Sequence, residues 1–254
     1  MFLKSLSASL ASILILSGSQ LNAQELPAPI KALQQKGLEV VGELPAIDGL
    51  KAYAGIMEQQ PYSLYLTPDG QHVVVGSVFD AQGNNLTREA LQAAIAQPMS
   101  KHTLAQLKAS TWVGDGNAQA PRQVYVFTDP NCPYCHQFWE QSRPWVKAGK
   151  VQLRHILVGV LSDSSPGKAA AILAASDPAK ALAQHESNMA TGGIEPLKSI
   201  SAELQATLLG NQALMGELGM QATPAIFYTD AQGVLRATRG APAQADLEKI
   251  LGPE

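Results

Sequence analysis

The stretch QVYVFTDPNCPYC, residues 123–135, decides the fold expected of this chain. Its apolar run from Val124 to Phe127 predicts a buried strand, and Cys132 and Cys135 follow almost at once. These are the only 2 cysteines of the chain. A loop of so few intervening residues restricts an unfolded chain very little, so the entropic case for a structural disulfide is weak. The spacing instead suits a thiol pair that cycles between dithiol and disulfide.

The cysteine pair is expected to open a helix, with Cys132 at its N-terminus and Cys135 one turn further in. Unpaired N–H groups and the positive end of the helix dipole favour a thiolate, so the pKa of Cys132 is expected to fall below the usual value of roughly 8.5. Pro133 fits the first helical turn, where no N–H partner is needed. Cys135 is expected to be the more buried sulfur, to attack a mixed disulfide on Cys132, and to release the partner.

A zinc site is the main alternative for two neighbouring cysteines. Such a site needs four ligands, and the chain has no second cysteine pair. His136 is adjacent but poorly placed to bind the same ion as both sulfurs. No metal and no cofactor is therefore expected beyond the redox-active disulfide that Cys132 and Cys135 can form.

The order of segments after the cysteines predicts a thioredoxin domain with a helical insertion. The active helix is expected to reach about residue 148, with a kink at Pro144 and with Phe138, Trp139 and Trp145 in the core. The segments that follow are a strand at 151–158, Ala- and Leu-rich helices within 164–218, a hairpin of 225–229 and 234–238, and a last helix near 244–251.

Thr223-Pro224 immediately precedes the apolar strand at 225–229. A peptide bond before proline can be cis at small cost. A cis proline placed against the cysteines would leave the Thr223 backbone free to pair with an extended substrate segment.

Residues 24–85 predict a small sheet-rich unit. Candidate strands lie at 38–44 and 50–57, and a hairpin of 62–67 and 72–80 surrounds Pro68-Asp69-Gly70, a strong turn signal. A unit this short buries little core by itself, so it either dimerises or packs on its C-terminal partner. Residues 86–112 predict an exposed linker helix that Thr87 caps, that Pro98 interrupts and that Ser100 caps again.

Residues 1–23 resemble a secretory signal. Lys4 precedes an apolar run between Leu6 and Leu16, and cleavage near Ala23 is expected. The run is shorter than the roughly 20 residues that span a bilayer, which disfavours an uncleaved anchor. The chain carries 18 Lys+Arg against 21 Asp+Glu, a net charge of −3, which argues against a nucleic-acid surface. An exported chain with two cysteines must be held together by its core.

Several motifs resemble the DsbG branch of the DsbC/DsbG family of periplasmic thiol:disulfide interchange proteins. These motifs are Thr128 to Cys135, Gln137 to Trp139, Arg143 to Val146, Gly149 to Arg154, Thr223 to Ile226 and the hairpin Tyr65 to Gly70. The resemblance covers nearly the whole chain after the signal. DsbC proteins typically carry Gly where this chain has Pro133, so the tetrapeptide favours the DsbG branch.

The resemblance implies an α+β protein that forms a V-shaped homodimer. Its parts would be an N-terminal dimerisation domain at 24–85, a linker helix at 86–112 and a C-terminal thioredoxin-like α/β domain at 113–254. Cys132 and Cys135 would be catalytic, and four further residues are expected to meet the substrate: Pro133, Tyr134, Thr223 and Pro224. A solvent-facing filler role for Tyr134 stays open.

The resemblance also implies a periplasmic role. Cys132 would be kept reduced by the membrane reductase DsbD, and it would reduce sulfenic acids on single-cysteine exported proteins such as L,D-transpeptidases. Disulfide isomerisation and chaperone activity are related roles. The alternatives are a DsbC-like isomerase, a monomeric DsbA-like oxidase for which the N-terminal domain would be surplus, and a periplasmic chaperone without redox chemistry.

The proton acceptor of Cys135 is not evident from the sequence. Many thioredoxins bury an acid six residues before the first cysteine, and that position here is Val126. Another group, or water, would have to take the proton. His136 is adjacent, although a surface position on the helix is the favoured interpretation, and Asp129 is interpreted as a turn residue before Pro130. The other histidines, which are His72, His102, His155 and His185, lack ligand-like spacing and receive no role.

Overall fold

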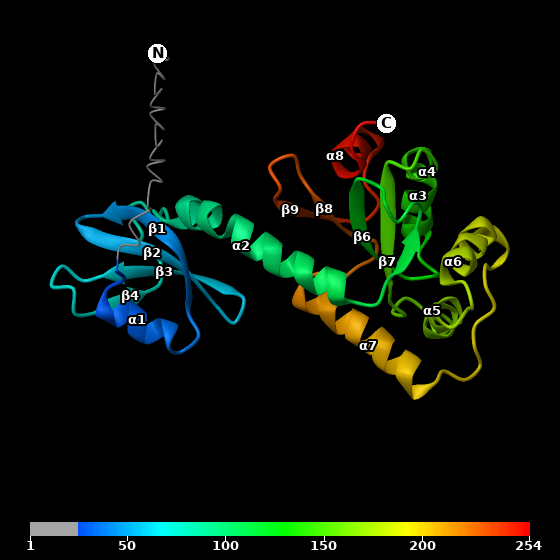
Figure 1. Cartoon of the computed structure of the whole chain (residues 1–254), viewed down its shortest axis with the longest axis horizontal. Coiled ribbons are helices and arrows are strands. Elements are labelled where there is room, and N and C mark those ends of the chain that lie inside the picture. The colour runs from blue at the N-terminus through cyan, green and yellow to red at the C-terminus, as the bar shows by residue number, and fades with distance from the viewer. Residues whose placement is uncertain (1–24) are drawn as a thin grey trace, which may run out of the picture.

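The computed structural model describes residues 25–254, in which two separate sheets are joined by one long helix (Figure 1). The signal peptide expected at 1–23 lies outside the described residues. Within the described part, no helix is both long enough and apolar enough to cross a membrane.

The N-terminal sheet is antiparallel, with strand order β1-β2-β3-β4. Its strands are β1 Glu39–Ile47, β2 Leu50–Met57, β3 Gln60–Leu66 and β4 Val73–Val75. The expected strands and hairpin are confirmed, but β4 ends at Val75 and the chain continues as a loop that holds only one bridge, Phe79 to Asn85. A helix that the sequence analysis did not predict, α1 Ala28–Gln34, buries Ile30 against Tyr53 and Leu64.

The linker forms a single helix, α2 Arg88–Ala109, so the predicted break at Pro98 is wrong. A proline inside a helix lacks one backbone hydrogen bond and costs about 3 kcal/mol. Packing offsets this cost, because α2 contacts the N-terminal sheet near its start and strand β9 (Leu235–Arg239) further along. Ser100 does not cap a second helix. Its hydroxyl donates to the Ala96 carbonyl at 2.6 Å and accepts from the Leu235 N–H at 2.9 Å.

The C-terminal sheet is mixed, with strand order β5-β7-β6-β8-β9. Its other strands are β5 Val113–Asp115, β6 Arg122–Thr128, β7 Val151–Leu157 and β8 Ala225–Thr229. β6 and β7 run parallel, and β8 runs antiparallel to β6. The carboxyl ends of β6 and β7 therefore share one edge with the start of β8. This edge holds the cysteine pair and Thr223-Pro224. β5 was not predicted, because a strand of three residues is too short for an apolar periodicity to show.

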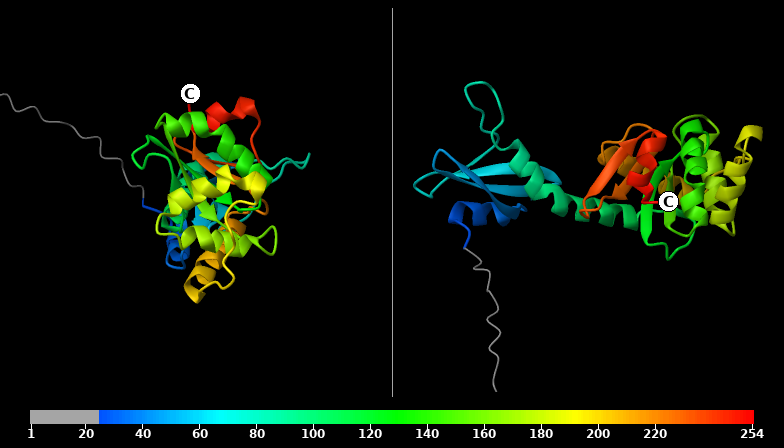
Figure 2. Two further views of the ribbon diagram at one scale, coloured as in Figure 1. Left: turned by 90° about the vertical axis from the view of Figure 1, so that its right-hand side faces the viewer. Right: turned by 90° about the horizontal axis from the view of Figure 1, so that it is seen from above.

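The helices of this domain follow the predicted order. They are α3 Pro133–Gln141, α4 Arg143–Lys147, α5 Ser165–Leu173, α6 Pro178–Ser187, α7 Ala202–Glu217 and α8 Leu247–Leu251, with short 3-10 turns at Met189–Thr191 and Gln244–Asp246. The kink expected near Pro144 is the break between α3 and α4 at Ser142. Figure 2 shows α5 and α6, in yellow-green, at the opposite end of the molecule from the N-terminal sheet.

Strand β6 contributes to both cores of the C-terminal domain because its side chains alternate between the faces of the sheet. Val124 and Val126 pack on one face with Phe138 of α3. Tyr125 and Phe127 pack on the other face in a cluster that includes Leu107 of α2, Met215 and Met220. The strand that precedes the cysteines is thus fixed from both sides, which holds the start of α3 in place.

Candidate active site

Cys132 is the N-cap residue of α3, and Cys135 lies in the first turn of that helix. The Cys132 sulfur accepts a hydrogen bond from the Cys135 N–H at 3.2 Å. When Cys132 is protonated, its thiol donates to the Thr223 carbonyl at 3.3 Å. Both cysteines are free thiols and both are buried, with 1% of Cys132 and 2% of Cys135 exposed. The position at the helix N-terminus is the one predicted from the sequence.

The two thiols differ in protonation more than in exposure. The pKa of Cys132 is lowered to about 6, chiefly by the hydrogen bond from the Cys135 thiol and against the opposing effect of burial. N–H groups of Cys135 and Tyr134 at the helix start lower it further. Burial, followed by the neighbouring Cys132, raises the pKa of Cys135 well above its usual value. Near neutral pH the pair therefore presents one thiolate, on Cys132, and one protonated thiol.

The four residues expected to meet substrate are all placed beside the sulfurs, but they differ in exposure. Pro133 and Tyr134 are exposed at the start of α3, and Tyr134 is 60% exposed. Thr223 and Pro224 are buried and joined by a cis peptide bond. The Thr223 backbone was expected to be free for a substrate, but its carbonyl accepts from the protonated Cys132 thiol.

Asp129 has a larger role than the turn residue that the sequence suggested. Its side chain is 1% exposed. One carboxylate oxygen accepts from the Asn131 N–H and the Ser165 hydroxyl, both at 2.8 Å. The other accepts from the N–H groups of Val160 at 2.7 Å and Leu161 at 3.0 Å. Asp129 thereby joins the loop before the cysteines to the loop that follows β7.

Asn131 extends this polar network toward the helical insertion. Its amide nitrogen lies within 3.0 Å of the hydroxyls of Ser162, Ser164 and Ser165. Its amide oxygen accepts from the Lys168 ammonium group at 2.8 Å, and that group also donates to the Gly192 carbonyl. The residue before Cys132 is therefore fixed by contacts that the sequence pattern alone does not reveal.

His136 is not the surface residue that the sequence analysis favoured. Its Nδ1 lies 2.8 Å from a carboxylate oxygen of Glu186, whose side chain is 2% exposed. Its Nε2 lies 3.5 Å from the exposed Glu140, and its ring stacks on Trp139. Glu186 lies four residues after Leu182 and so on the same, buried face of α6, but this spacing does not identify His136 as its partner.

His185, which received no role, is also buried against the site. Its Nε2 donates to the Pro130 carbonyl at 2.7 Å, while its Nδ1 accepts from the Ile194 N–H at 3.0 Å. Burial is the main reason why the pKa of His185 is lowered, and the lowered pKa keeps the ring neutral in this arrangement. Two consecutive residues of α6, His185 and Glu186, thus hold the chain on both sides of the cysteine pair.

The corner between α3 and α4 is held by a partly buried ion pair. Arg143 donates to both carboxylate oxygens of Asp115 in β5, and its guanidinium lies over the Trp139 ring at 4.2 Å. Burial would raise the pKa of Asp115, but the nearby His155, whose Nε2 lies 3.7 Å from a carboxylate oxygen, and the hydrogen bonds from Arg143 outweigh it and hold the pKa well below the usual range. Phe138 and Trp145 are buried as predicted, whereas Trp139 is only partly buried, so its predicted place in the core is wrong.

The position of the acid found in many thioredoxins is apolar here, as the sequence indicated. Val126 is 1% exposed and packs in the same cluster as Phe138. Among the described residues, no group of three or more His, Cys, Asp or Glu is arranged to hold a metal ion. The chemistry that this arrangement supports is thiol exchange at Cys132.

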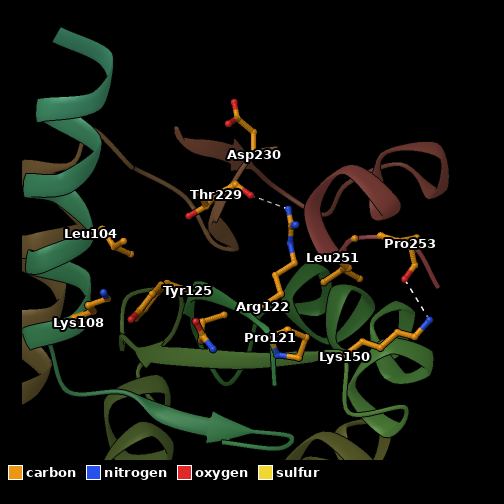
Figure 3. Close-up of a pocket in the computed structure, with 12 residues that line it drawn as sticks. Leu104, Lys108, Pro121, Arg122, Tyr125, Lys150, Thr229, Asp230, Leu251 and Pro253 are labelled. Atoms are coloured by element: carbon orange, nitrogen blue, oxygen red, sulfur yellow. Dashed lines mark hydrogen bonds between the residues drawn. The ribbon is translucent and has the colours of Figure 1, made fainter. Parts of the chain in front are cut away.

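A separate cavity of about 560 Å³ lies at the other end of β6 (Figure 3). Leu104 and Lys108 of α2 line one side of it, and Arg122 and Tyr125 of β6 line another. Figure 3 shows Arg122 directed toward the Thr229 carbonyl, to which it donates at 2.8 Å. The cavity is at the start of β6, whereas the cysteines follow its end, so it does not belong to the thiol site.

Comparisons with known proteins point to the same thiol-exchange chemistry as the geometry of the site. The family described as a thioredoxin-like domain matches residues 116–252. A thiol:disulfide interchange protein DsbG from Pseudomonas aeruginosa is 49% identical over 240 residues, which is 94% of each chain. DsbG from Escherichia coli is 41% identical over 230 residues, covering 91% of this chain and 93% of the relative.

Two more distant similarities were also found. DsbC from Escherichia coli is 29% identical over 172 residues, covering 66% of this chain and 65% of the relative. A solved structure of a linker-deletion mutant of Proteus mirabilis ScsC has a TM-score of 0.51 at 19% identity, covering 65% of this chain and 87% of that one, and is similar in fold alone.

Proposed function

The chain belongs to the DsbG family of thiol:disulfide interchange proteins, and we propose on that basis that Cys132 and Cys135 reduce oxidised cysteines of exported proteins. The observation that carries the proposal is the difference in pKa between the two thiols. Cys132 has a pKa of about 6 at the start of α3, while the pKa of the buried Cys135 is raised. This difference supports Cys132 as the nucleophile and Cys135 as the resolving residue.

The first step is attack by the Cys132 thiolate on the sulfur of a substrate sulfenic acid. A Cys132–substrate disulfide forms, the sulfur–oxygen bond breaks, and the oxygen leaves as hydroxide, which becomes water with one proton. In the second step Cys135 loses its proton and attacks the Cys132 sulfur. The substrate leaves as a thiol, and the protein keeps a Cys132–Cys135 disulfide. Two electrons pass from the dithiol to the substrate cysteine.

The resulting disulfide must be reduced again before another cycle. An external dithiol supplies two electrons, and the membrane reductase DsbD is the partner that the family resemblance suggests. The substrates proposed on the same ground are exported proteins with a single oxidised cysteine, such as L,D-transpeptidases. Pro133, Tyr134, Thr223 and Pro224 would contact them, since these residues border Cys132 on two sides.

A homodimer formed through the N-terminal sheet belongs to the same proposal. β4 is the edge strand of that sheet, and it carries Val74 and Val75 at 58% and 49% exposure. The following loop exposes Phe79 at 56% and Leu86 at 48%. An exposed apolar edge strand is a template for pairing with another chain. Two copies joined here would carry two thiol sites, one at the far end of each α2.

The domain limits and the compartment follow from this proposal. Residues 1–23 would direct export to the periplasm, 24–85 would dimerise, 86–112 would link, and 113–254 would perform the exchange. Chaperone activity of the cleft between two such domains is a related role.

Disulfide isomerisation is the second candidate function, and the 29% identity to DsbC is the observation that favours it. An isomerase attacks wrong disulfides in proteins that have several of them, whereas a sulfenic acid reductase acts on single cysteines. The chemistry at Cys132 is the same, so only the substrate distinguishes the two.

A direct test uses the reduced full chain and two substrates. One is a single-cysteine protein converted to its sulfenic acid, and the other is a scrambled protein with several disulfides. We expect one Cys132–Cys135 disulfide for each sulfenic acid removed, with a slower effect on the scrambled protein. Cys132→Ser should abolish both reactions. Full activity of Cys132→Ser would overturn the proposal, and a faster reaction with the scrambled protein would favour the isomerase.

A further inference from the structure

Two loops leave the C-terminal sheet side by side at the edge that holds the cysteines. β6 and β7 are parallel neighbours, with Thr128 opposite Leu157, and the Val158 N–H donates to the Thr128 carbonyl at 3.0 Å. The chain after β6 leads to Cys132, and the chain after β7 leads to Val160 and Leu161. Ligands of α/β sheets bind outside the carboxyl ends of such strands. The loop after β7 therefore lies where a substrate of Cys132 would arrive.

The loop after β7 is held in one shape by a buried carboxylate. The N–H groups of Val160 and Leu161 both donate to the same oxygen of Asp129, whose side chain is 1% exposed. With their backbone groups directed inward, the two side chains are left partly in solvent, 38% exposed for Val160 and 51% for Leu161. Unlike an ordinary surface loop, this one is tied to the residue three positions before Cys132.

Val160 and Leu161 are exposed apolar residues directly before a polar segment of the same loop. The residues that follow are Ser162, Asp163, Ser164 and Ser165, all polar. Val160 and Leu161 are thus exposed apolar side chains on the loop after β7, and Tyr134, between the two cysteines, is a third exposed residue with an apolar ring, at 60% exposure. Such a pair of side chains, presented by a fixed backbone, can bind an aliphatic or aromatic side chain of a partner.

We propose that Val160 and Leu161 recognise a large apolar side chain next to the oxidised cysteine of a protein substrate, and that Asp129 is the residue that positions them. The inference rests on the proposed function and narrows its substrate class. Exchange at Cys132 would then be faster when a leucine, rather than a serine, accompanies the reacting cysteine.

The test compares two peptides that differ only by leucine or serine beside a single cysteine. Each is prepared as a mixed disulfide with 2-nitro-5-thiobenzoate, and attack by Cys132 on the peptide sulfur releases this coloured thiol. The readout is the second-order rate constant for release of the coloured thiol, taken as the ratio of its value for the leucine peptide to its value for the serine peptide. Contact with one extra aliphatic group changes such ratios by roughly 10-fold or more. We expect a ratio of about 10 for the wild type.

Four variants identify which residues produce the difference in rate between the two peptides. Val160→Ser/Leu161→Ser should bring it close to one, whereas Leu209→Ser, at a 59% exposed position on α7, should keep the wild-type ratio. Asp129→Asn presents an amide where four donors converge, so it should displace the loop and lower the ratio as well. Ser165→Ala removes one donor to Asp129 and provides a milder version if Asp129→Asn does not fold.

The outcomes separate this inference from the function on which it rests. A wild-type ratio near one, or an unchanged ratio in Val160→Ser/Leu161→Ser, overturns the recognition surface while exchange at Cys132 still stands. An unchanged ratio in both Asp129→Asn and Ser165→Ala overturns the positioning role. If the reduced wild type releases no coloured thiol from either peptide, the proposed function fails, and the inference fails with it.

Discussion

The Nδ1 atom of His136 lies 2.8 Å from a carboxylate oxygen of Glu186, which joins the residue after Cys135 to the buried face of α6. The preceding residue of α6, His185, donates to the Pro130 carbonyl on the other side of the cysteine pair. The helical insertion, through α6, therefore contacts the sheet domain at the active site. It holds both ends of the segment that contains the two reactive sulfurs.

Removing His136 should destabilise the domain more than its partial exposure suggests. His136→Ala leaves the buried Glu186 carboxylate without its hydrogen-bond donor, and such a loss costs about 3 kcal/mol. The free energy of unfolding in urea measures this. Glu140→Gln is the matched control, because Glu140 is 63% exposed and lies 3.5 Å from His136, so little change is expected.

The double variant His136→Ala/Glu186→Ala distinguishes a coupled pair from two independent residues. Because both partners are removed, its loss should be smaller than the sum of the two single losses. Strict additivity of the two losses would contradict the pairing of these side chains.

The reactivity of Cys132 should follow a pKa of about 6. Below this pH the thiol is protonated and alkylates slowly, and above it the thiolate makes alkylation fast and then nearly independent of pH. Stopped-flow alkylation, or the thiolate absorbance near 240 nm, records this curve. Cys132→Ser should show no titration in the same range, since burial raises the pKa of Cys135.

Replacing Cys135 should raise the pKa of Cys132. The hydrogen bond from the Cys135 thiol makes the largest contribution to the lowered pKa of Cys132. Cys135→Ala removes this hydrogen bond while leaving the start of the helix intact. The midpoint of the alkylation curve should therefore move from about 6 toward the usual range of free thiols, roughly 8.5. An unmoved midpoint would assign the lowered pKa to the helix N-terminus alone.

Asp115 should make stability depend on pH at the acid end. Its pKa is lowered in the folded state despite burial, because His155 lies close to it and Arg143 donates to it, so its contribution is present above the unfolded value of roughly 3.9. That contribution is lost as the pH falls below this value. Asp115→Asn should lose about 2 kcal/mol at neutral pH and should show a smaller further loss in acid. Parallel acid profiles for wild type and variant, from urea unfolding, would contradict this assignment.

The oligomeric state should depend on the exposed residues of β4 and its loop. Val75→Glu/Phe79→Glu places charges on the edge of the N-terminal sheet and should convert a dimer to a monomer in sedimentation. Leu209→Glu, on an equally exposed residue of α7, should leave the dimer intact. A monomeric wild type, or a dimer that survives the double substitution, would refute the proposed interface.

The sequence predicted those features that depend on neighbouring residues. The strand before Cys132, the N-terminal position of Cys132 on its helix and the lowered pKa of its thiol all follow from one continuous stretch, 123–135. The order of segments then indicated the thioredoxin-like sheet, and the turn at Pro68-Asp69-Gly70 indicated the N-terminal hairpin.

Features that depend on distant residues could not be predicted in this way. Asp129 accepts a hydrogen bond from Val160, which lies 31 residues later in the chain. His136 contacts Glu186, which lies 50 residues later. Local pattern assigned the first to a turn and the second to the surface, because neither partner can be identified from spacing. Pro98 was misinterpreted for a related reason. Contacts of α2 with both sheets outweigh a local preference that would end the helix.

The central claim is that Cys132 attacks the oxidised cysteine and that Cys135 resolves the product. The most direct measurement mixes the reduced Cys135→Ala chain with a sulfenylated single-cysteine protein and analyses the products by non-reducing mass spectrometry. We predict a stable one-to-one disulfide through Cys132, which the wild type does not accumulate because Cys135 releases the partner. The matched variant Cys132→Ala should form no such product. A disulfide that forms through Cys135 in Cys132→Ala, with none through Cys132 in Cys135→Ala, would contradict the assignment.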